Sequence, residues 1–189
     1  LIGYYIAEGS NHRAYIRFSL GNYEMEFAKE ILNLIEGIFG IKGFIYKREK
    51  ESNRTGLEVT ACNSKLANIF ENLCGLHSEN KSIPFEFQYL PIEKQKIILD
   101  AIHRGDGMIG KVAKCKKDRK YKAITTTSLT LAEQLRDILL RLGKSPGFYV
   151  EKEKIDKKNV HHKKAFTVQW QEDYILNFSQ FYRNAKEKT

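Results

Sequence analysis

LIGYYIAEG at Leu1–Gly9 and LDAIHRGDG at Leu99–Gly107 follow one plan, in which an apolar run with small residues ends on an acidic residue and a glycine. Each stretch predicts a helix that ends at this glycine. The repetition puts Glu8 and Asp106 at equivalent points of two similar half-chains. A pair of carboxylates in such positions is suited to hold metal ions between the halves.

The segments that follow the two stretches share an order of elements. Arg13–Leu20 alternates apolar and polar residues, which predicts a strand with one face on a core. Helices at Glu24–Phe39 and Thr130–Leu142 occupy matching places in the two halves. The sequence therefore predicts an α+β fold of two pseudo-twofold-related αββαββα repeats that form a saddle of antiparallel sheets. The other predicted elements are strands at Gly43–Arg48, Leu57–Cys62, Tyr121–Thr127, Gly147–Glu151 and Ala165–Trp170, and helices at Ser64–Leu73, from Ile92 into the second stretch, and at Asp173–Tyr182.

The chain of 189 residues divides into two repeats and a connection. We expect a first repeat at 1–76, a linker with a lead-in helix at 77–95, and a second repeat at 96–189. Lys81-Ser82-Ile83-Pro84 and Pro91 mark the linker.

Small residues recur inside the two opening stretches, at Gly3, Ala7, Ala101 and Gly105. Because no bulky side chain separates the backbones there, the two helices can pack closely side by side. Both carboxylates then emerge at one end of the helix pair. We expect the glycines that follow them to end the helices in a left-handed backbone conformation.

The chain is strongly basic, with 32 Lys and Arg against 23 Asp and Glu, a net charge of +9 and a pI of about 9.3. Lys111–Lys122 carries seven basic residues and a single acid, and a second cluster spans Lys152–Lys164. This distribution predicts a polyanionic partner, with phosphate contacts in loops and strand ends.

The composition also excludes some classes. No apolar run approaches the ~20 residues of a membrane-spanning helix, and no cationic leader with a cleavage site opens the sequence. The three cysteines, Cys62, Cys74 and Cys115, lack metal-finger spacing. They are expected to be reduced thiols of an intracellular protein.

On these residues the chain resembles the LAGLIDADG homing endonucleases, in their single-chain form with two repeats. Leu1, Gly3, Ala7 and Gly9 are identical to the nine-residue motif of the family, and Leu99, Asp106 and Gly107 match it in the second stretch. The Lys81–Pro84 segment is similar to the one that precedes the second motif in these enzymes. The chain departs from the pattern in having Glu8 for aspartate, and Asp100, His103 and Arg104 in the second motif.

The resemblance implies a monomeric, site-specific endonuclease that cuts both strands of a long, asymmetric DNA duplex and leaves short 3′ overhangs. Glu8 and Asp106 would bind Mg²⁺, for which Mn²⁺ can substitute, and Lys65 resembles the basic residue that such enzymes place beside the attacking water. Two alternatives stay open: an RNA maturase that assists intron splicing, and a DNA-binding protein of the same fold without cleavage. The sequence leaves an intron or an intein origin equally open.

The exposed strand faces and the basic hairpins carry the candidate DNA contacts, because such side chains bind base edges in a major groove or phosphates. They are Arg13, Tyr15, Arg17, Ser19, Lys47, Arg48, Arg54, Lys114, Lys116, Lys117, Arg119, Lys122, Thr125, Thr127, Lys152, Lys154, His161 and Lys163.

Overall fold

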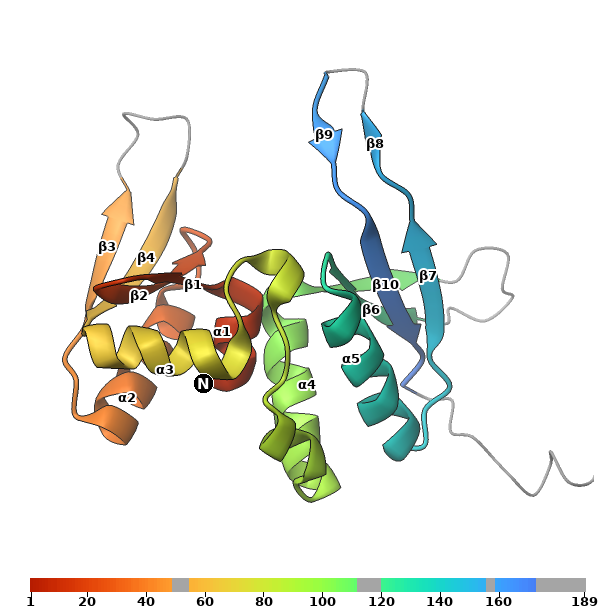
Figure 1. Cartoon of the computed structure of the whole chain (residues 1–189), viewed down its shortest axis with the longest axis horizontal. Helices are drawn as coiled ribbons and strands as arrows, with labels where there is room; N and C mark the ends of the chain where they lie inside the picture. The colour runs from red at the N-terminus through yellow and green to blue at the C-terminus, as the bar shows by residue number, and fades with distance from the viewer. Residues whose placement is uncertain (49–54, 112–119, 156–158, 173–189) are drawn as a thin grey trace, which may run out of the picture.

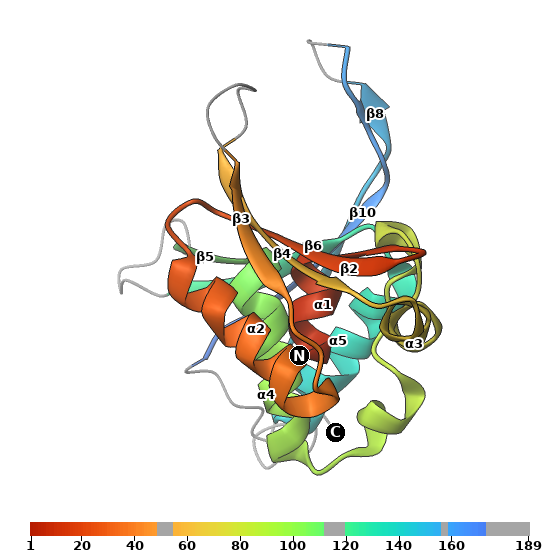
Figure 2. The same ribbon diagram turned by 90° about the vertical axis from the view of Figure 1, so that its left-hand side faces the viewer.

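Helices lie beneath two antiparallel sheets in this computed structural model, which describes residues 1–48, 55–111, 120–155 and 159–172 (Figure 1). The first sheet has the strand order β1-β2-β4-β3 and the second the order β5-β6-β10-β7. Hairpins at both ends of the pair of sheets (Figure 1) rise away from the helices (Figure 2), which gives the saddle expected from the sequence. The bounds of the strands are β1 Gly9–His12, β2 Tyr15–Leu20, β3 Phe44–Arg48, β4 Gly56–Cys62, β5 Gly107–Lys111, β6 Lys120–Thr126, β7 Gly147–Glu151 and β10 Ala165–Trp170.

Five α-helices belong to the described part of the chain and follow the predicted order. They are α1 Ile2–Glu8, α2 Met25–Phe39, α3 Ser64–Cys74, α4 Ile92–Asp106 and α5 Leu129–Arg141. Two short 3₁₀ helices, η1 Ser78–Asn80 and η2 Phe85–Tyr89, lie between α3 and α4. The helix predicted at Asp173–Tyr182 lies outside the described residues. None of the described helices is long and apolar enough to cross a membrane.

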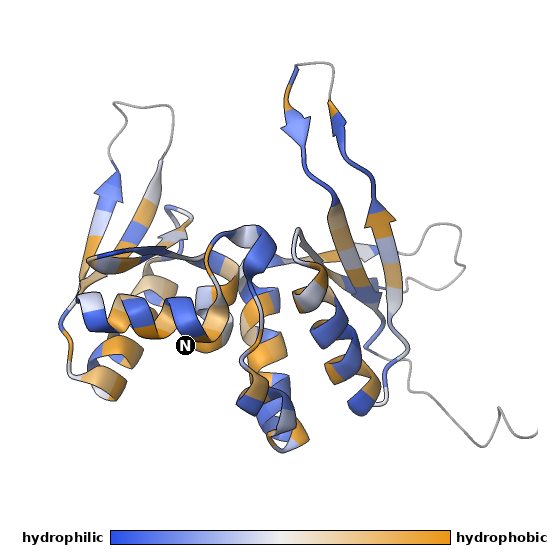
Figure 3. Cartoon of the chain, viewed as in Figure 1, coloured by the Kyte–Doolittle hydropathy of each residue, from blue (hydrophilic) through white to orange (hydrophobic). Residues whose placement is uncertain are grey.

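The second half contains a short extra sheet of β8 Lys154–Ile155 and β9 His161–His162. It continues the hairpin of β7 and β10 away from the helices, and hydrophilic residues predominate along it (Figure 3). The sequence did not predict these two strands, because a two-residue strand has too little alternation to be recognised.

The two sheets repeat the same strand register. Gly9 pairs with Phe18 and Phe18 with Val59 in the first sheet. In the second sheet, Gly107 pairs with Ile124 and Ile124 with Val168. The two halves therefore correspond position by position, as expected from the repeated order of elements.

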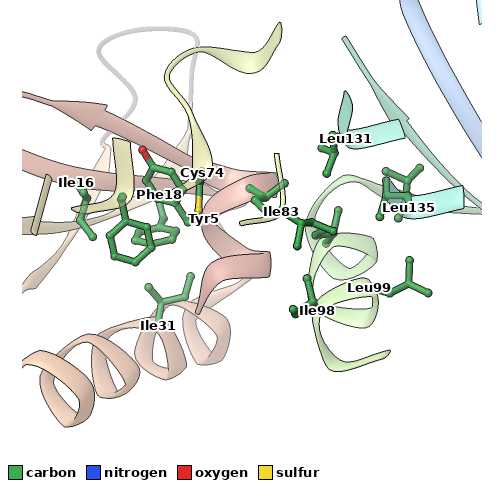
Figure 4. Close-up of a cluster of buried hydrophobic side chains, with 14 of the residues drawn as sticks. Tyr5, Ile16, Phe18, Ile31, Cys74, Ile83, Ile98, Leu99, Leu131 and Leu135 are labelled. Atoms are coloured by element: carbon green, nitrogen blue, oxygen red, sulfur yellow. The ribbon is translucent and has the colours of Figure 1, made fainter. Parts of the chain in front are cut away.

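A single buried core extends under both sheets, on the side of the helices. Ile16, Phe18 and Leu20, the predicted inward face of β2, are at most 6% exposed. Tyr5 and Phe18 pack in the first half, and Leu131 and Leu135 face α4 in the second (Figure 4). Burial of these side chains leaves the opposite face of each sheet open.

Helices α1 and α4 cross in the middle of the molecule with their small residues in contact. A Cβ atom at Gly3 would lie 2.6 Å from the Cβ of Ala101 and 2.8 Å from the Ile98 carbonyl oxygen. A Cβ atom at Gly105 would lie 2.7 Å from the Cβ of Ala7. The close packing predicted from these residues is therefore confirmed, and it places the ends of the two helices together.

We expect Gly3→Ala to lower the free energy of unfolding by about 1–3 kcal/mol, because the new methyl group would overlap backbone and side-chain atoms of α4. Gly37→Ala is the matched control within α2, since no atom lies within 4 Å of its added Cβ. The control substitution should raise the free energy of unfolding by about 0.5–1 kcal/mol. Urea unfolding of both variants measures the difference, and an equal effect at both positions would contradict close helix packing.

Candidate active site

Glu8 and Asp106 are the last residues of α1 and α4. The glycine after each carboxylate opens a strand directly, with φ of −82° at Gly9 and −84° at Gly107. The left-handed conformation expected at these glycines is therefore wrong. Glycine is required at both positions because other backbone atoms approach closely. A Cβ at Gly9 would lie 2.5 Å from the Tyr5 carbonyl oxygen, and one at Gly107 would overlap the His103 carbonyl oxygen.

The two carboxylates hold their protons more tightly than ordinary acids. Burial, together with the charges of Asp106 and Glu24, raises the pKa of Glu8 to about 7. Burial also raises the pKa of Asp106 to about 6, and the charge of Lys81 partly opposes this rise. Above neutral pH the site therefore gathers negative charge that only a cation can compensate well.

The donor set suits a hard divalent cation such as Mg²⁺, which takes few carboxylates and keeps several water ligands. Among the described residues, no group of three or more His, Cys, Asp and Glu side chains comes together for metal binding. Glu8 and Asp106 would thus supply the charged ligands, and backbone carbonyls, water or substrate phosphate would complete the shell.

A cavity of about 640 Å³ lies at these helix ends and is lined by both halves of the chain. Ala7 and Asp106 of the two motifs line it, together with Arg17 of β2, Lys81 of the linker and Thr127 after β6. In the described structure, Arg17 Nε and Thr127 Oγ1 are buried and have no hydrogen-bond partner. Two orphaned polar groups next to a carboxylate indicate a site for a polar ligand or water.

Lys81 is the buried lysine of this cavity, with 7% of its surface exposed. Its Nζ donates hydrogen bonds of 3.1 Å to the carbonyl oxygens of Tyr5 and Gly9, and it lies 3.5 Å from the centre of the Tyr5 ring. Burial lowers the pKa of Lys81 to about 8, although the charges of Cys74 and Asp106 oppose this shift. An amine with this pKa can exchange a proton near neutral pH.

Helix α5 of the second half fixes the segment that carries Lys81. Ser128 Oγ donates a 2.7 Å hydrogen bond to the Lys81 carbonyl oxygen. Gln134 accepts from the Ile83 N–H at 2.7 Å and donates to the Ile83 carbonyl at 3.0 Å. The linker is therefore held between α1 of the first half and α5 of the second.

Lys65, the basic residue predicted for the site, lies exposed in the first turn of α3 and does not line the cavity. Lys81 was missed as a site residue in the sequence. The available signal was the likeness of Lys81–Pro84 to the segment before the second motif.

The predicted DNA contacts fall into three groups by their place on the sheets. Tyr15, Arg17 and Ser19 alternate with the buried face of β2 and lie on the open face of the first sheet, and Thr125 does so in the second. Lys47 pairs with Leu57 and Lys122 with Trp170, so the register puts both on the side of the helices. Lys122 forms a 2.7 Å ion pair with Glu172 there.

The third group surrounds the hairpins. Lys152, Lys154, His161 and Lys163 are exposed on the β7–β10 extension, with His161 2.8 Å from Glu153 and Lys163 3.3 Å from Glu79. Arg13 is exposed in the β1–β2 turn. The predictions for Arg54, Lys114, Lys116, Lys117 and Arg119 lie outside the described residues.

We expect the raised pKa values to make the metal-free protein less stable as pH rises. The folded state retains protons on Glu8 and Asp106 up to pH 6–7, whereas the unfolded chain releases them near pH 4, so folding loses stability between these limits. In EDTA, the fall in Tm from pH 5 to 8 should be about 2–4 °C larger for wild type than for a Glu8→Gln, Asp106→Asn double variant. This difference corresponds to ~1 kcal/mol in the free energy of unfolding, after allowance for solvent screening. Differential scanning calorimetry from pH 5 to 8 measures this, and parallel Tm curves would contradict it.

The fold and the paired helix ends resemble those of LAGLIDADG proteins. Residues 1–75 match the family model described as a LAGLIDADG-like domain, which confirms the resemblance seen in the motifs over this part of the chain.

Two curated archaeal proteins are similar in sequence to part of the chain. The uncharacterized protein MJ0043 of Methanocaldococcus jannaschii is 33% identical over 147 residues, 76% of this chain and 16% of that protein. The ATP-dependent DNA helicase Hel308 of Thermococcus kodakarensis is 28% identical over 148 residues, 76% of this chain and 12% of the helicase. The chain thus spans less than a fifth of the length of either relative.

Solved structures share the fold at low sequence identity. The homing endonuclease I-DmoI in complex with DNA and Mn has a TM-score of 0.57 at 13% identity, with 90% of this chain and 86% of that chain covered. Full-length DUF199/WhiA from Thermatoga maritima has a TM-score of 0.52 at 12% identity, with 91% and 49% covered. The predicted fold class is confirmed by these likenesses.

Proposed function

We propose that the chain is a DNA endonuclease of the homing type, which hydrolyses phosphodiester bonds with a divalent metal ion. The observation that carries this proposal is the pair of carboxylates, Glu8 and Asp106, at the ends of α1 and α4 beneath two open sheets, with the pKa of each raised. Structures of I-DmoI with DNA and Mn or Mg support the choice of partner and metal.

The residues of the two helix ends and of the cavity have distinct parts in the proposed reaction. Glu8 and Asp106 would hold the metal ion, which would supply Lewis-acid stabilisation of the phosphoryl oxygens. Lys81 would orient the attacking water and move a proton at Nζ, since its lowered pKa of about 8 leaves part of it neutral near physiological pH. Arg17 Nε and Thr127 Oγ1 are unpartnered donors, in the described structure, for a phosphate oxygen in the same cavity.

The open faces of both sheets would contact the duplex. A major groove about 12 Å wide admits strands, and the two sheets carry arginine, tyrosine, serine and threonine side chains on their open faces. We propose Mg²⁺ as the metal, a long asymmetric target and short 3′ overhangs, as the family resemblance implies. The maturase and the binding protein without cleavage are less well supported, because neither function needs a carboxylate at the end of both helices.

The origin of the chain is part of the proposal. The matching segments of 147 and 148 residues make up 16% and 12% of two much longer proteins. This pattern supports a module carried inside longer polypeptides, as in an intein, over a free-standing intron product. The repeat boundaries, the monomeric state and the intracellular location stay predictions.

A cleavage assay tests the proposed function. The full chain is incubated with Mg²⁺ and a plasmid that carries the host locus without its insertion. A discrete double-strand cut in this plasmid, absent from the same plasmid with the locus scrambled, is the expected result. Intact plasmid at all metal concentrations would contradict the proposal.

We expect binding to duplex DNA to weaken steeply with salt. Each phosphate neutralised by lysine or arginine releases counterions, so contact with roughly 6 phosphates would lower affinity by about a thousandfold between 50 and 200 mM salt. Fluorescence anisotropy in EDTA, which prevents cleavage, measures the slope. A flat salt dependence would count against a duplex partner.

A further inference from the structure

Resting on the proposed function, we propose that Glu58 determines target specificity by holding Arg17 and Arg48 on the open face of the first sheet, where the two arginines recognise the guanines of G·C base pairs. We call these three residues the Arg–Glu–Arg group. Glu58 is not among the acidic residues that the sequence predicts for the site. Its position on the sheet follows from the strand register.

Glu58 lies on the open face because its neighbours in β4 face the core. Leu57 and Val59 are 1% and 0% exposed beneath the sheet, and successive residues of a strand point to opposite sides. One carboxylate oxygen, Glu58 Oε1, accepts a hydrogen bond from Arg48 Nη2 and lies 3.4 Å from Arg17 Nη1. The side chain of Glu58 is only 14% exposed, so both guanidinium groups largely cover it.

The charges of the group favour base edges over the DNA backbone. A carboxylate between two arginines repels phosphate and leaves a net charge of only one, which weakens non-specific attraction. Each guanidinium keeps N–H donors besides the one that contacts Glu58. Arginine donors that Glu58 holds in place match O6 and N7 of guanine.

The second sheet carries no such group at the corresponding positions. Glu58 pairs with Tyr46 in the first sheet, and Thr167 pairs with Tyr149 in the second, so Thr167 stands where Glu58 stands. In the same register Ala123 corresponds to Arg17.

Thr167 has a different hydrogen-bond partner. Its Oγ1 lies 2.8 Å from Thr125 Oγ1, a neutral pair of hydroxyl groups. The two sheets therefore offer different chemistry to two half-sites of a duplex. Because Arg17 also lines the cavity, the G·C pairs are expected on the side of the first half-site nearer the cut.

Selection from randomised DNA duplexes tests this role. Full-length wild type, Glu58→Gln and Thr167→Val are each allowed to bind the same pool in EDTA, and the enriched sequences are compared. Glu58→Gln keeps the shape of the side chain, and Thr167→Val is the matched control at the equivalent place in the second sheet. Thermal unfolding of each variant verifies that it is folded.

We expect Glu58→Gln to lower the G·C preference roughly tenfold within a short block of one half-site only. The same variant should bind a random duplex about threefold more tightly, since a charge that repels phosphate is gone. Thr167→Val should leave that block unchanged and alter the other half-site. An unchanged G·C block in Glu58→Gln, or equal losses in both half-sites, would overturn the assignment. Wild type that enriches no sequence would instead overturn the proposed function itself.

Discussion

Glu8→Gln and Asp106→Asn are each expected to lower double-strand cleavage by roughly a thousandfold, because each variant removes a charged ligand for the metal ion. Binding to the duplex should change by less than about threefold, since neither carboxylate attracts phosphate. Cleavage of a target plasmid in Mg²⁺ and anisotropy in EDTA measure the two quantities separately. The amides keep the size of the acids, so the helix crossing stays intact.

Glu24→Gln is the control for a general charge effect. Glu24 lies close enough for its charge to raise the pKa of Glu8, yet its Oε2 accepts a 2.6 Å hydrogen bond from the Gly21 N–H and it is not at the end of a motif helix. This variant should cut at nearly the wild-type rate. Normal cleavage by both Glu8→Gln and Asp106→Asn would remove the metal site from the proposal, whatever the control shows.

Lys81→Met should lower the cleavage rate about a hundredfold with little effect on DNA affinity, because the cavity would lose the group that moves a proton. The rate of wild type should rise with pH up to about 8, as Lys81 becomes neutral, and this limb should be missing in the variant. Since Lys81 shares the cavity with Asp106, the Lys81→Met variant should cut one DNA strand more slowly than the other. Nicked plasmid would then accumulate on an agarose gel.

Lys81→Arg separates catalysis from structure. Arginine keeps a positive charge at the end of α1, where cations stabilise the helix, yet it does not release a proton near neutral pH. Recovery of stability without recovery of rate is the expected result. Full activity of Lys81→Arg would show that the lysine only supports the helix end. Lys65→Met, on the exposed turn of α3, should be close to wild type in both respects.

The sequence predicted those parts of the fold that depend on local patterns. The bounds of β7 and β10 agree with the structure, because apolar alternation and polar turns delimit both strands. Gly3 and Ala101 predicted the close contact of the two helices, since small residues on one helix face leave room for a second backbone. The two acids follow directly from the repeated motif.

Features that depend on contacts between distant parts of the chain could not be predicted from the sequence. Lys81 enters the cavity because Ser128 and Gln134, about fifty residues away, fix its segment. A one-residue difference in register decides whether Lys47 and Lys122 face the helices or the duplex, and charge alone does not reveal it.

The hydrogen bonds from α5 to the linker also bear on how such proteins can be recombined. A boundary at residue 76 would look natural for exchanging one repeat with that of a relative. Yet Lys81 receives its backbone support from Ser128 of the second repeat and reaches carbonyl oxygens of the first. The transferable unit is therefore larger than a repeat. A chimera would need the linker and the face of α5 that contacts it from the same parent. Otherwise the Lys81 side chain would be displaced in the cavity.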